Sequence, residues 1–106
     1  MARWSEHTHP EVASSVYGRI PGNYVVWFTD GTAYVGRQSA TTNRIRAAIN
    51  RHPREVHAVQ FMADREDREC RRVEREHNKM IALLQAGVPL RNKVRAAVPS
   101  HCEVEW

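Results

Sequence analysis

Two short apolar runs stand out between Pro21 and Arg37, in the stretch "PGNYVVWFTDGTAYVGR". Two runs of β-branched and aromatic residues flank a Thr-Asp-Gly turn, which predicts a hairpin with strands over Tyr24–Phe28 and Thr32–Val35. Residues 1–20 carry polar clusters interrupted by proline and glycine, and this composition favours an irregular lead-in.

The hydrophobic period lengthens from Thr41, and we expect a threonine to cap a helix over "NRIRAAINR". Ile45, Ala48 and Ile49 share one face of that helix, and His52–Pro53 ends it. The remaining elements are a third strand over Val56–Met62, a long helix over Asp64–Ala86 closed by Gly87 and Pro89, and a short helix near Lys93–Ala97. This order, β-β-α-β-α, predicts an α+β fold: a three-stranded antiparallel sheet with flanking helices.

The long helix has one apolar stripe, which predicts its core face. The stripe consists of Cys70, Val73, His77, Met80, Ile81 and Leu84. Cations gather on one flank of the remaining surface, namely Arg68, Arg71, Arg72, Arg75 and Lys79. Glu74 lies on the border between this flank and the stripe, where a half-shielded carboxylate suits a metal ligand or a charge-tuned acid. The alternative is a surface pairing of Glu74 with Arg71 or Asn78, one helical turn away.

Length and composition limit the classes of function that the chain can have. A chain of 106 residues makes one domain, and 16 Lys and Arg against 12 Asp and Glu give a formal charge of +4, which favours a polyanionic partner.

Apolar runs are too short to cross a membrane, and the N-terminus lacks the apolar middle of a secretory signal, so we expect an intracellular, cytoplasmic protein without a membrane partner. Two cysteines, Cys70 and Cys102, do not make a disulfide framework, and free thiols are expected.

The hairpin has two possible registers with different consequences for Tyr24 and Tyr34. A two-residue Asp30–Gly31 loop places the two rings on opposite faces of the sheet. A three-residue Thr29–Asp30–Gly31 loop, with the glycine left-handed in a bulge, places both rings on one face. Only the second register makes a site, and tyrosines in strands are also common without any role.

The order of polar residues along the chain resembles the GIY-YIG nuclease family. The resemblance covers about Pro21 to Lys93 and rests on Gly22-Asn23-Tyr24, on Tyr34-Val35-Gly36, on Arg44 eight residues later, on Glu74 in the long helix, and on Asn92. The first motif departs from the family in its polar middle residue, Asn23, whose side chain is expected to face away from the tyrosines. The first helix has no obvious match for the auxiliary histidine or tyrosine of some relatives, and His52 is the nearest candidate.

This resemblance implies a metal-dependent DNA endonuclease that hydrolyses phosphodiester bonds. Glu74 would ligate one Mg²⁺ or Mn²⁺, and Tyr24, with its pKa lowered by Arg37 and Arg44, would accept a proton from water. Tyr34 would position water or phosphate, and Arg44 would stabilise charge on the phosphate. The supporting residues are Gly36, which permits close approach, Asn92, which fixes the cleft by hydrogen bonds, Arg37 and His52.

The implied organisation is a lead-in over 1–20, a nuclease domain over 21–93 and a C-terminal extension over 94–106 that packs on it. The cationic flank of the long helix would hold the nucleic-acid backbone without reading sequence. DNA is the expected substrate, with RNA also open, and selectivity would come from DNA shape, from a homodimer or from a targeting partner protein.

Two other functions fit the sequence. One is a catalytically silent nucleic-acid-binding module with the same fold. The other is a metal-binding regulator built on His7, His9, His77, His101, Cys70 and Cys102, although their spacings match no familiar zinc pattern.

Overall fold

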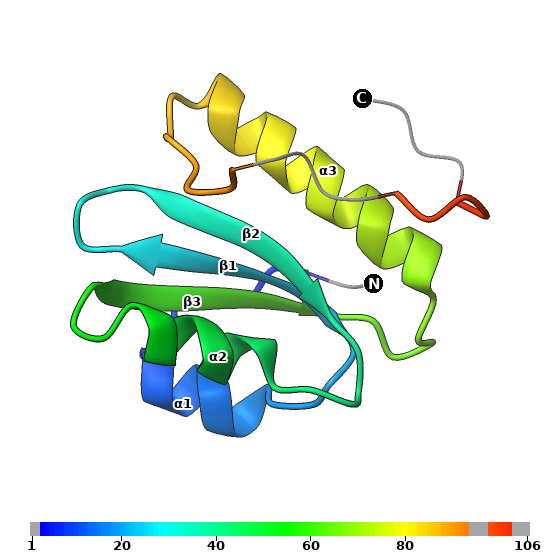
Figure 1. Cartoon of the computed structure of the whole chain (residues 1–106), viewed down its shortest axis with the longest axis horizontal. Coiled ribbons are helices and arrows are strands. Elements are labelled where there is room, and N and C mark those ends of the chain that lie inside the picture. Colours follow the sequence, from blue (N-terminus) through cyan, green and yellow to red (C-terminus); the bar gives the residue numbers. More distant parts are fainter. Residues whose placement is uncertain (1–2, 94–97, 103–106) are drawn as a thin grey trace.

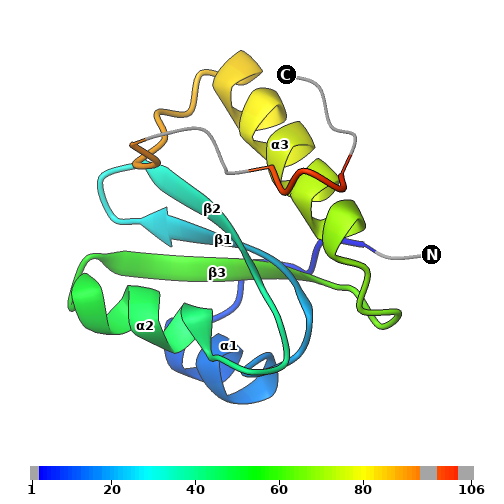
Figure 2. The same ribbon diagram turned by 45° about the vertical axis from the view of Figure 1, so that its right-hand side comes forward.

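The computed structural model describes residues 3–93 and 98–102, and its elements form an α+β sandwich of three layers. A three-stranded antiparallel sheet has the strand order β2-β1-β3. Figure 1 shows α3 on one face of this sheet and α1 with α2 on the other, and Figure 2 gives the same arrangement from a second direction. The elements are α1 (Pro10–Val16), β1 (Gly22–Phe28), β2 (Ala33–Gln38), α2 (Arg44–Arg51), β3 (Val56–Ala63) and α3 (Glu69–Gln85).

The predicted order β-β-α-β-α is confirmed from residue 22 onward, but the prediction of an irregular lead-in over 1–20 is wrong where α1 lies. Pro10 occupies the first turn of α1, where its missing N–H costs nothing, and the His9 ring accepts a hydrogen bond from the Glu11 N–H. Ala13 is fully buried against the core. Packing therefore stabilises a helix of only 7 residues whose own sequence gives little signal.

The hairpin adopts the three-residue loop. Tyr24 pairs with Gly36 and Val26 with Tyr34, so both tyrosines lie on one face of the sheet, and Gly31 has φ +84°. The Asp30 carboxylate accepts hydrogen bonds from the hydroxyl and the N–H of Thr32, at 2.6 and 3.0 Å. These bonds hold the pKa of Asp30 at about 2. The turn is thus fixed by local polar contacts as well as by its glycine.

Each face of the sheet has its own apolar core. Alternate residues of β1, among them Tyr24, Val26 and Phe28, pack with α1 and α2, while Val25 packs with the α3 residues Met80 and Leu83. Asn23 points to the α3 face, as expected, and its side-chain amide donates to the Arg72 carbonyl at 2.8 Å and to the Gly36 carbonyl at 3.4 Å. The polar middle residue of the first motif is therefore accommodated beneath α3.

The long helix begins five residues later than predicted. The Asp64 carboxylate accepts from the Arg68 N–H at 2.6 Å and from the Arg72 guanidinium at 2.8 Å, which holds residues 64–68 in a loop. At the other end Gly87 has φ +82°, as a helix stop requires. The predicted core stripe is also partly wrong, because Leu83 is buried whereas Leu84 is 56% exposed.

The two cysteines form a disulfide, so the expectation of free thiols is wrong. Cys70, in the first turn of α3, is bonded to Cys102 in the C-terminal segment, with 5.2 Å between their Cα atoms. Cys102 is 8% exposed. Most of the short helix predicted near Lys93–Ala97 lies outside the described residues. No helix in the described ranges is long and apolar enough to cross a membrane.

Candidate active site

Tyr24 lies at the centre of the candidate site, over Gly36 of the neighbouring strand. Its ring is 4% exposed and its centroid lies 6.4 Å from that of Tyr34, with the two ring planes inclined by 27°. A Cβ atom at position 36 would collide with the Tyr24 ring and hydroxyl. Because Gly36 has no side chain, the Tyr24 ring can lie directly over it, in agreement with the close approach predicted at this glycine.

The charges around Tyr24 come from three elements. Burial raises the pKa of Tyr24 far above its ordinary value, and the nearby Tyr34 and Glu76 act in the same direction. The positive charges of Arg44 and Arg51, at the two ends of α2, oppose this shift but do not outweigh burial. Arg44 thus acts in the expected direction, but burial dominates, so the expectation of a lowered Tyr24 pKa is wrong and the phenol keeps its proton at neutral pH.

Glu76, rather than Glu74, is the carboxylate of α3 that reaches the site. Glu76 is 5% exposed and its Oε1 accepts a hydrogen bond from Arg37 Nη1 at 2.6 Å. Burial raises the pKa of Glu76, while the Arg37 guanidinium acts in the opposite direction. Glu74 is exposed, so the prediction that its carboxylate is half shielded is wrong.

The misplaced stripe explains this difference. The predicted stripe also includes Cys70 and Ile81, which are only half-buried. Together with Leu84 they turn its centre by roughly 70° from the observed buried face, away from Glu76 and towards Glu74. The signal that could have found Glu76 is the set Val73, Glu76, Met80 and Leu83, which repeats at intervals of three and four residues and matches the buried face.

Gln38, which sequence reasoning missed, positions Arg44. Its side chain is 2% exposed, donates from Nε2 to the carbonyls of Tyr17 and Ile20 at 2.7 and 2.9 Å, and accepts from the Arg44 N–H at 3.2 Å. The helix cap is Asn43, whose side chain accepts from the Arg46 N–H, and not the predicted threonine. These amides fix the start of α2 against the end of β2, and with it the placement of Arg44.

Asn92 makes the hydrogen bonds expected of it. Its Oδ1 accepts from the Val35 N–H at 3.0 Å and its Nδ2 donates to the Val35 carbonyl at 2.9 Å, so one side chain satisfies both backbone groups of a strand residue. A cleft of about 660 Å³ lies beside it. The cleft is lined by Tyr34, Arg51, His52, Arg91, Asn92 and Lys93, a set without acidic side chains.

His52 thus shares a cleft with Tyr34, as the supporting role requires. Its ring also meets the Phe28 ring edge-on at 5.1 Å between centroids. A second, smaller cleft of about 250 Å³ includes Arg37, Arg44 and Glu69 among its lining residues. Both clefts contain arginines, but Arg37 pairs with Glu76, and Arg91 pairs with Asp30 and Glu55. Arg44 in the smaller cleft and Arg51 in the larger one suit a phosphate-bearing ligand.

The cationic flank predicted on α3 divides into distinct groups. Arg71 and Arg75 line two adjoining grooves of about 500 and 600 Å³, and the second groove also contains Trp4 and Lys79. The Lys79 ammonium lies 4.8 Å from the centroid of the Trp4 ring, and desolvation lowers the Lys79 pKa.

The other two members of the flank contact acidic side chains. Arg72 is 6% exposed and pairs with Asp64 and Asp67, so it is not available to a nucleic-acid backbone. Arg68 is exposed and pairs with Glu66 at 3.2 Å. An exposed ion pair of this kind is weak, so Arg68, Arg71, Arg75 and Lys79 still fit the predicted backbone contacts and Arg72 does not.

Comparison with known proteins gives no match for this chain among protein-family models, curated proteins or solved structures.

Proposed function

We propose that this protein is a metal-dependent endonuclease of the GIY-YIG type, acting on DNA phosphodiester bonds. The observation that carries the proposal is the convergence on one phenol: Tyr24 and Tyr34 share a face, and the charges of Arg44 and Glu76 both act on the Tyr24 hydroxyl. These groups come from β1, β2, α2 and α3, so the fold gathers residues separated by up to 52 positions (76 − 24). From β1 onward, the order of strands and helices is also the one expected for the proposed family.

The proposed roles follow the geometry. Arg44, at the N-terminus of α2, would bind the phosphate and stabilise its developing charge. Tyr34, in the cleft with Arg51 and His52, would orient water or phosphate. Tyr24, which stays protonated, would donate a hydrogen bond to the phosphate instead of accepting a proton from water.

Glu76 replaces Glu74 as the proposed metal ligand. Magnesium binds through one or two carboxylates together with waters and substrate phosphates, and Glu76 is a buried carboxylate beside Tyr24, so the donor set fits Mg²⁺ or Mn²⁺. When bound, the metal would supply positive charge against the phosphate. Arg37 would then share or release the Glu76 carboxylate, since it now holds one of the oxygens.

The ion pair between Arg37 and Glu76 favours the second candidate, a catalytically silent nucleic-acid-binding module. A carboxylate kept by an arginine binds a cation less readily, while the two basic clefts would still bind a phosphate backbone. Binding of DNA without metal-dependent cleavage would distinguish this module from the nuclease.

A supercoiled-plasmid nicking assay separates the two candidates. Wild type, Glu76→Gln, Glu74→Gln and Arg44→Ala are compared with Mg²⁺ or Mn²⁺ and with EDTA. Glu74→Gln is the matched control, because it makes the same chemical change two residues away on an exposed position. We expect metal-dependent nicking by wild type and by Glu74→Gln, loss of nicking in Glu76→Gln, and a fall of about 10²–10³ in rate for Arg44→Ala.

Two outcomes would count against the nuclease. Equal nicking by Glu76→Gln and wild type would reject Glu76 as the metal ligand. DNA binding by every variant without any metal-dependent nicking would favour the silent module. Far-ultraviolet circular dichroism of each variant shows whether a lost activity reflects a lost fold.

A further inference from the structure

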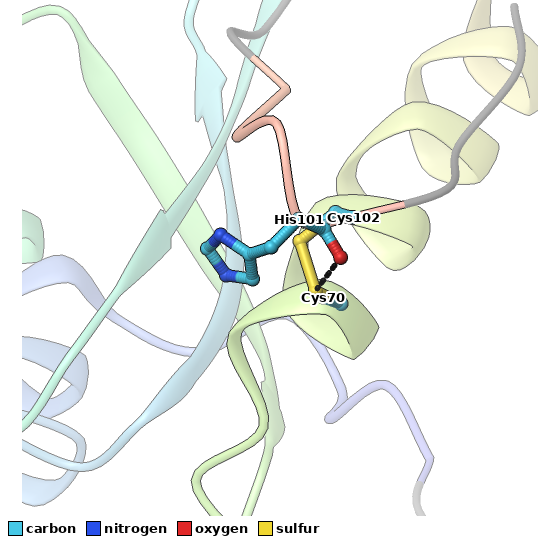
Figure 3. Close-up of a disulfide and its surroundings, with 3 residues drawn as sticks. All are labelled: Cys70, His101 and Cys102. Carbon is cyan, nitrogen blue, oxygen red and sulfur yellow. Dashed lines mark hydrogen bonds between the residues drawn. A yellow bond between two sulfur atoms is a disulfide. The ribbon is translucent and has the colours of Figure 1, made fainter.

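Three metal-ligating side chains meet where the C-terminal segment joins the first turn of α3. They are Cys70, His101 and Cys102, and their sulfur and ring-nitrogen ligand atoms all lie within 4.8 Å of one another. Figure 3 shows Cys70 on the helix and the other two residues on the segment that runs past it. His101 is exposed, Cys70 is half-buried and Cys102 is buried, so the cluster is open on one side to solvent.

The disulfide joins two of the three ligands in the present state. A dithiol reductant would transfer two electrons and two protons to it, which gives two thiols and leaves the reductant as its own disulfide. Each thiol then loses a proton on binding a metal ion, because the thiolate is the ligand. The imidazole of His101 supplies a nitrogen ligand and takes no part in the reduction.

The separations of the three ligand atoms suit a metal ion with tetrahedral coordination. Zinc takes sulfur at about 2.3 Å and nitrogen at about 2.0–2.1 Å, so ligand atoms at tetrahedral angles lie about 3.5–3.8 Å apart. Atoms already gathered within 4.8 Å reach these separations through opening of the sulfur–sulfur bond and small side-chain rotations. Two sulfurs and a nitrogen also select zinc over the hard cations Mg²⁺ and Mn²⁺.

We propose that Cys70, His101 and Cys102 form a zinc site when the disulfide is reduced. The fourth position is open to water or to a ligand from solution. Disulfide and zinc are then two alternative ways of fastening residues 98–102 to the start of α3, one for oxidising and one for reducing conditions. The proposal does not depend on nuclease activity, because no ligand is shared with the site around Tyr24.

The test is a metal titration of the full chain, oxidised and reduced, without oxygen. Reduced wild type should bind one equivalent of Co²⁺ with the visible bands of a tetrahedral ion and near-ultraviolet thiolate charge-transfer bands, and Zn²⁺ should displace it. Oxidised wild type should bind none. In the reduced protein, Zn²⁺ should also protect both thiols from alkylation by iodoacetamide.

Variants assign the ligands. His101→Ala should weaken zinc binding by more than about tenfold, since even an outer-shell partner is worth that much, and should still form the disulfide. His57→Ala, at an exposed histidine of β3, is the matched control and should bind as wild type does. Cys70→Ser and Cys102→Ser should lose the charge-transfer bands. Reduced wild type that binds no more metal than these serine variants, or His101→Ala that binds as tightly as wild type, would overturn the assignment.

Discussion

Gly36→Ala tests whether the Tyr24 ring owes its position to a missing side chain. The new Cβ atom would lie against Cζ and the hydroxyl of Tyr24 and 2.8 Å from Cε2, where ordinary contacts are 3.4–4 Å. The ring must then move by about 1 Å within a close-packed core. An overlap of this size places the cost of overpacking in the upper part of its usual range, about 2–3 kcal/mol, and the stiffer backbone of alanine offsets about 0.5–1 kcal/mol, so we expect a net loss of about 1–2.5 kcal/mol.

A double-mutant cycle isolates the contact. Urea unfolding is measured for wild type, Gly36→Ala, Tyr24→Leu and the double variant. With leucine at position 24 the ring is gone and the alanine has room. The double variant should therefore lose about 1 kcal/mol less unfolding free energy than the two single variants lose together. Additivity within about 0.5 kcal/mol, or a Gly36→Ala protein as stable as wild type, would show that the ring does not lie over Gly36.

Four further measurements test other features. Cys102→Ser should lower the oxidised protein's unfolding free energy by roughly 3–4 kcal/mol, from the loop-closure entropy of a 32-residue separation, and the difference should vanish in reductant with EDTA. Asn92→Asp loses the donor to the Val35 carbonyl and should cost about 1–2 kcal/mol in urea unfolding. Tyr24 has a raised pKa, so the native state holds that proton more tightly than the unfolded chain does; stability should fall as pH rises above about 10, and Tyr24→Phe should flatten this fall in unfolding curves. If Arg71 contacts one phosphate, Arg71→Ala should reduce the slope of log binding constant against log salt by about 1, measured by fluorescence anisotropy with labelled duplex DNA.

Much of the fold could be predicted because local signals agree with the final packing. The β1–β2 hairpin combines two runs of β-branched and aromatic residues with Thr29–Asp30–Gly31, and the turn chemistry leaves only two registers. The end of α3 is marked by Gly87 in the same way. These features depend on residues close together in the chain.

The disulfide and α1 could not be predicted because they depend on contacts between distant residues, and the start of α3 depends on side-chain bonds over four and eight positions that the helical pattern does not reveal. Asp64 holds the loop before α3 through Arg72, a contact that competes with the helical pattern of the sequence. The pairing of Cys70 with Cys102 requires the C-terminal segment to return to α3, and no local pattern indicates that path.

The candidate site was only partly predictable for a related reason. Tyr24, Tyr34, Arg44 and Asn92 follow from motif order, but Glu76 follows from the rotation of α3 about its axis. Cys70, Ile81 and Leu84 turn the predicted stripe by roughly 70° from the observed buried face, because all three are exposed or only half-buried. The rotation of a helix about its axis is therefore the weakest step in locating a side chain from sequence when partly exposed apolar residues extend the apparent core face.

The borders of the sheet limit how this protein can associate with others. Along β3, the N–H and the carbonyl of Thr8 are both hydrogen-bonded to the backbone of Val59. The Ser5 N–H donates to the Phe61 carbonyl, and the Ser5 hydroxyl accepts from the Phe61 N–H. Along β2, the Ala33 N–H donates to the Pro89 carbonyl, and the Ala33 carbonyl accepts from the Arg91 N–H. The Asn92 side chain bonds both the N–H and the carbonyl of Val35. A foreign strand finds no vacant amide or carbonyl at these four positions, so they resist the strand addition from which aggregates and swapped dimers grow. Association at these positions must therefore proceed through side chains.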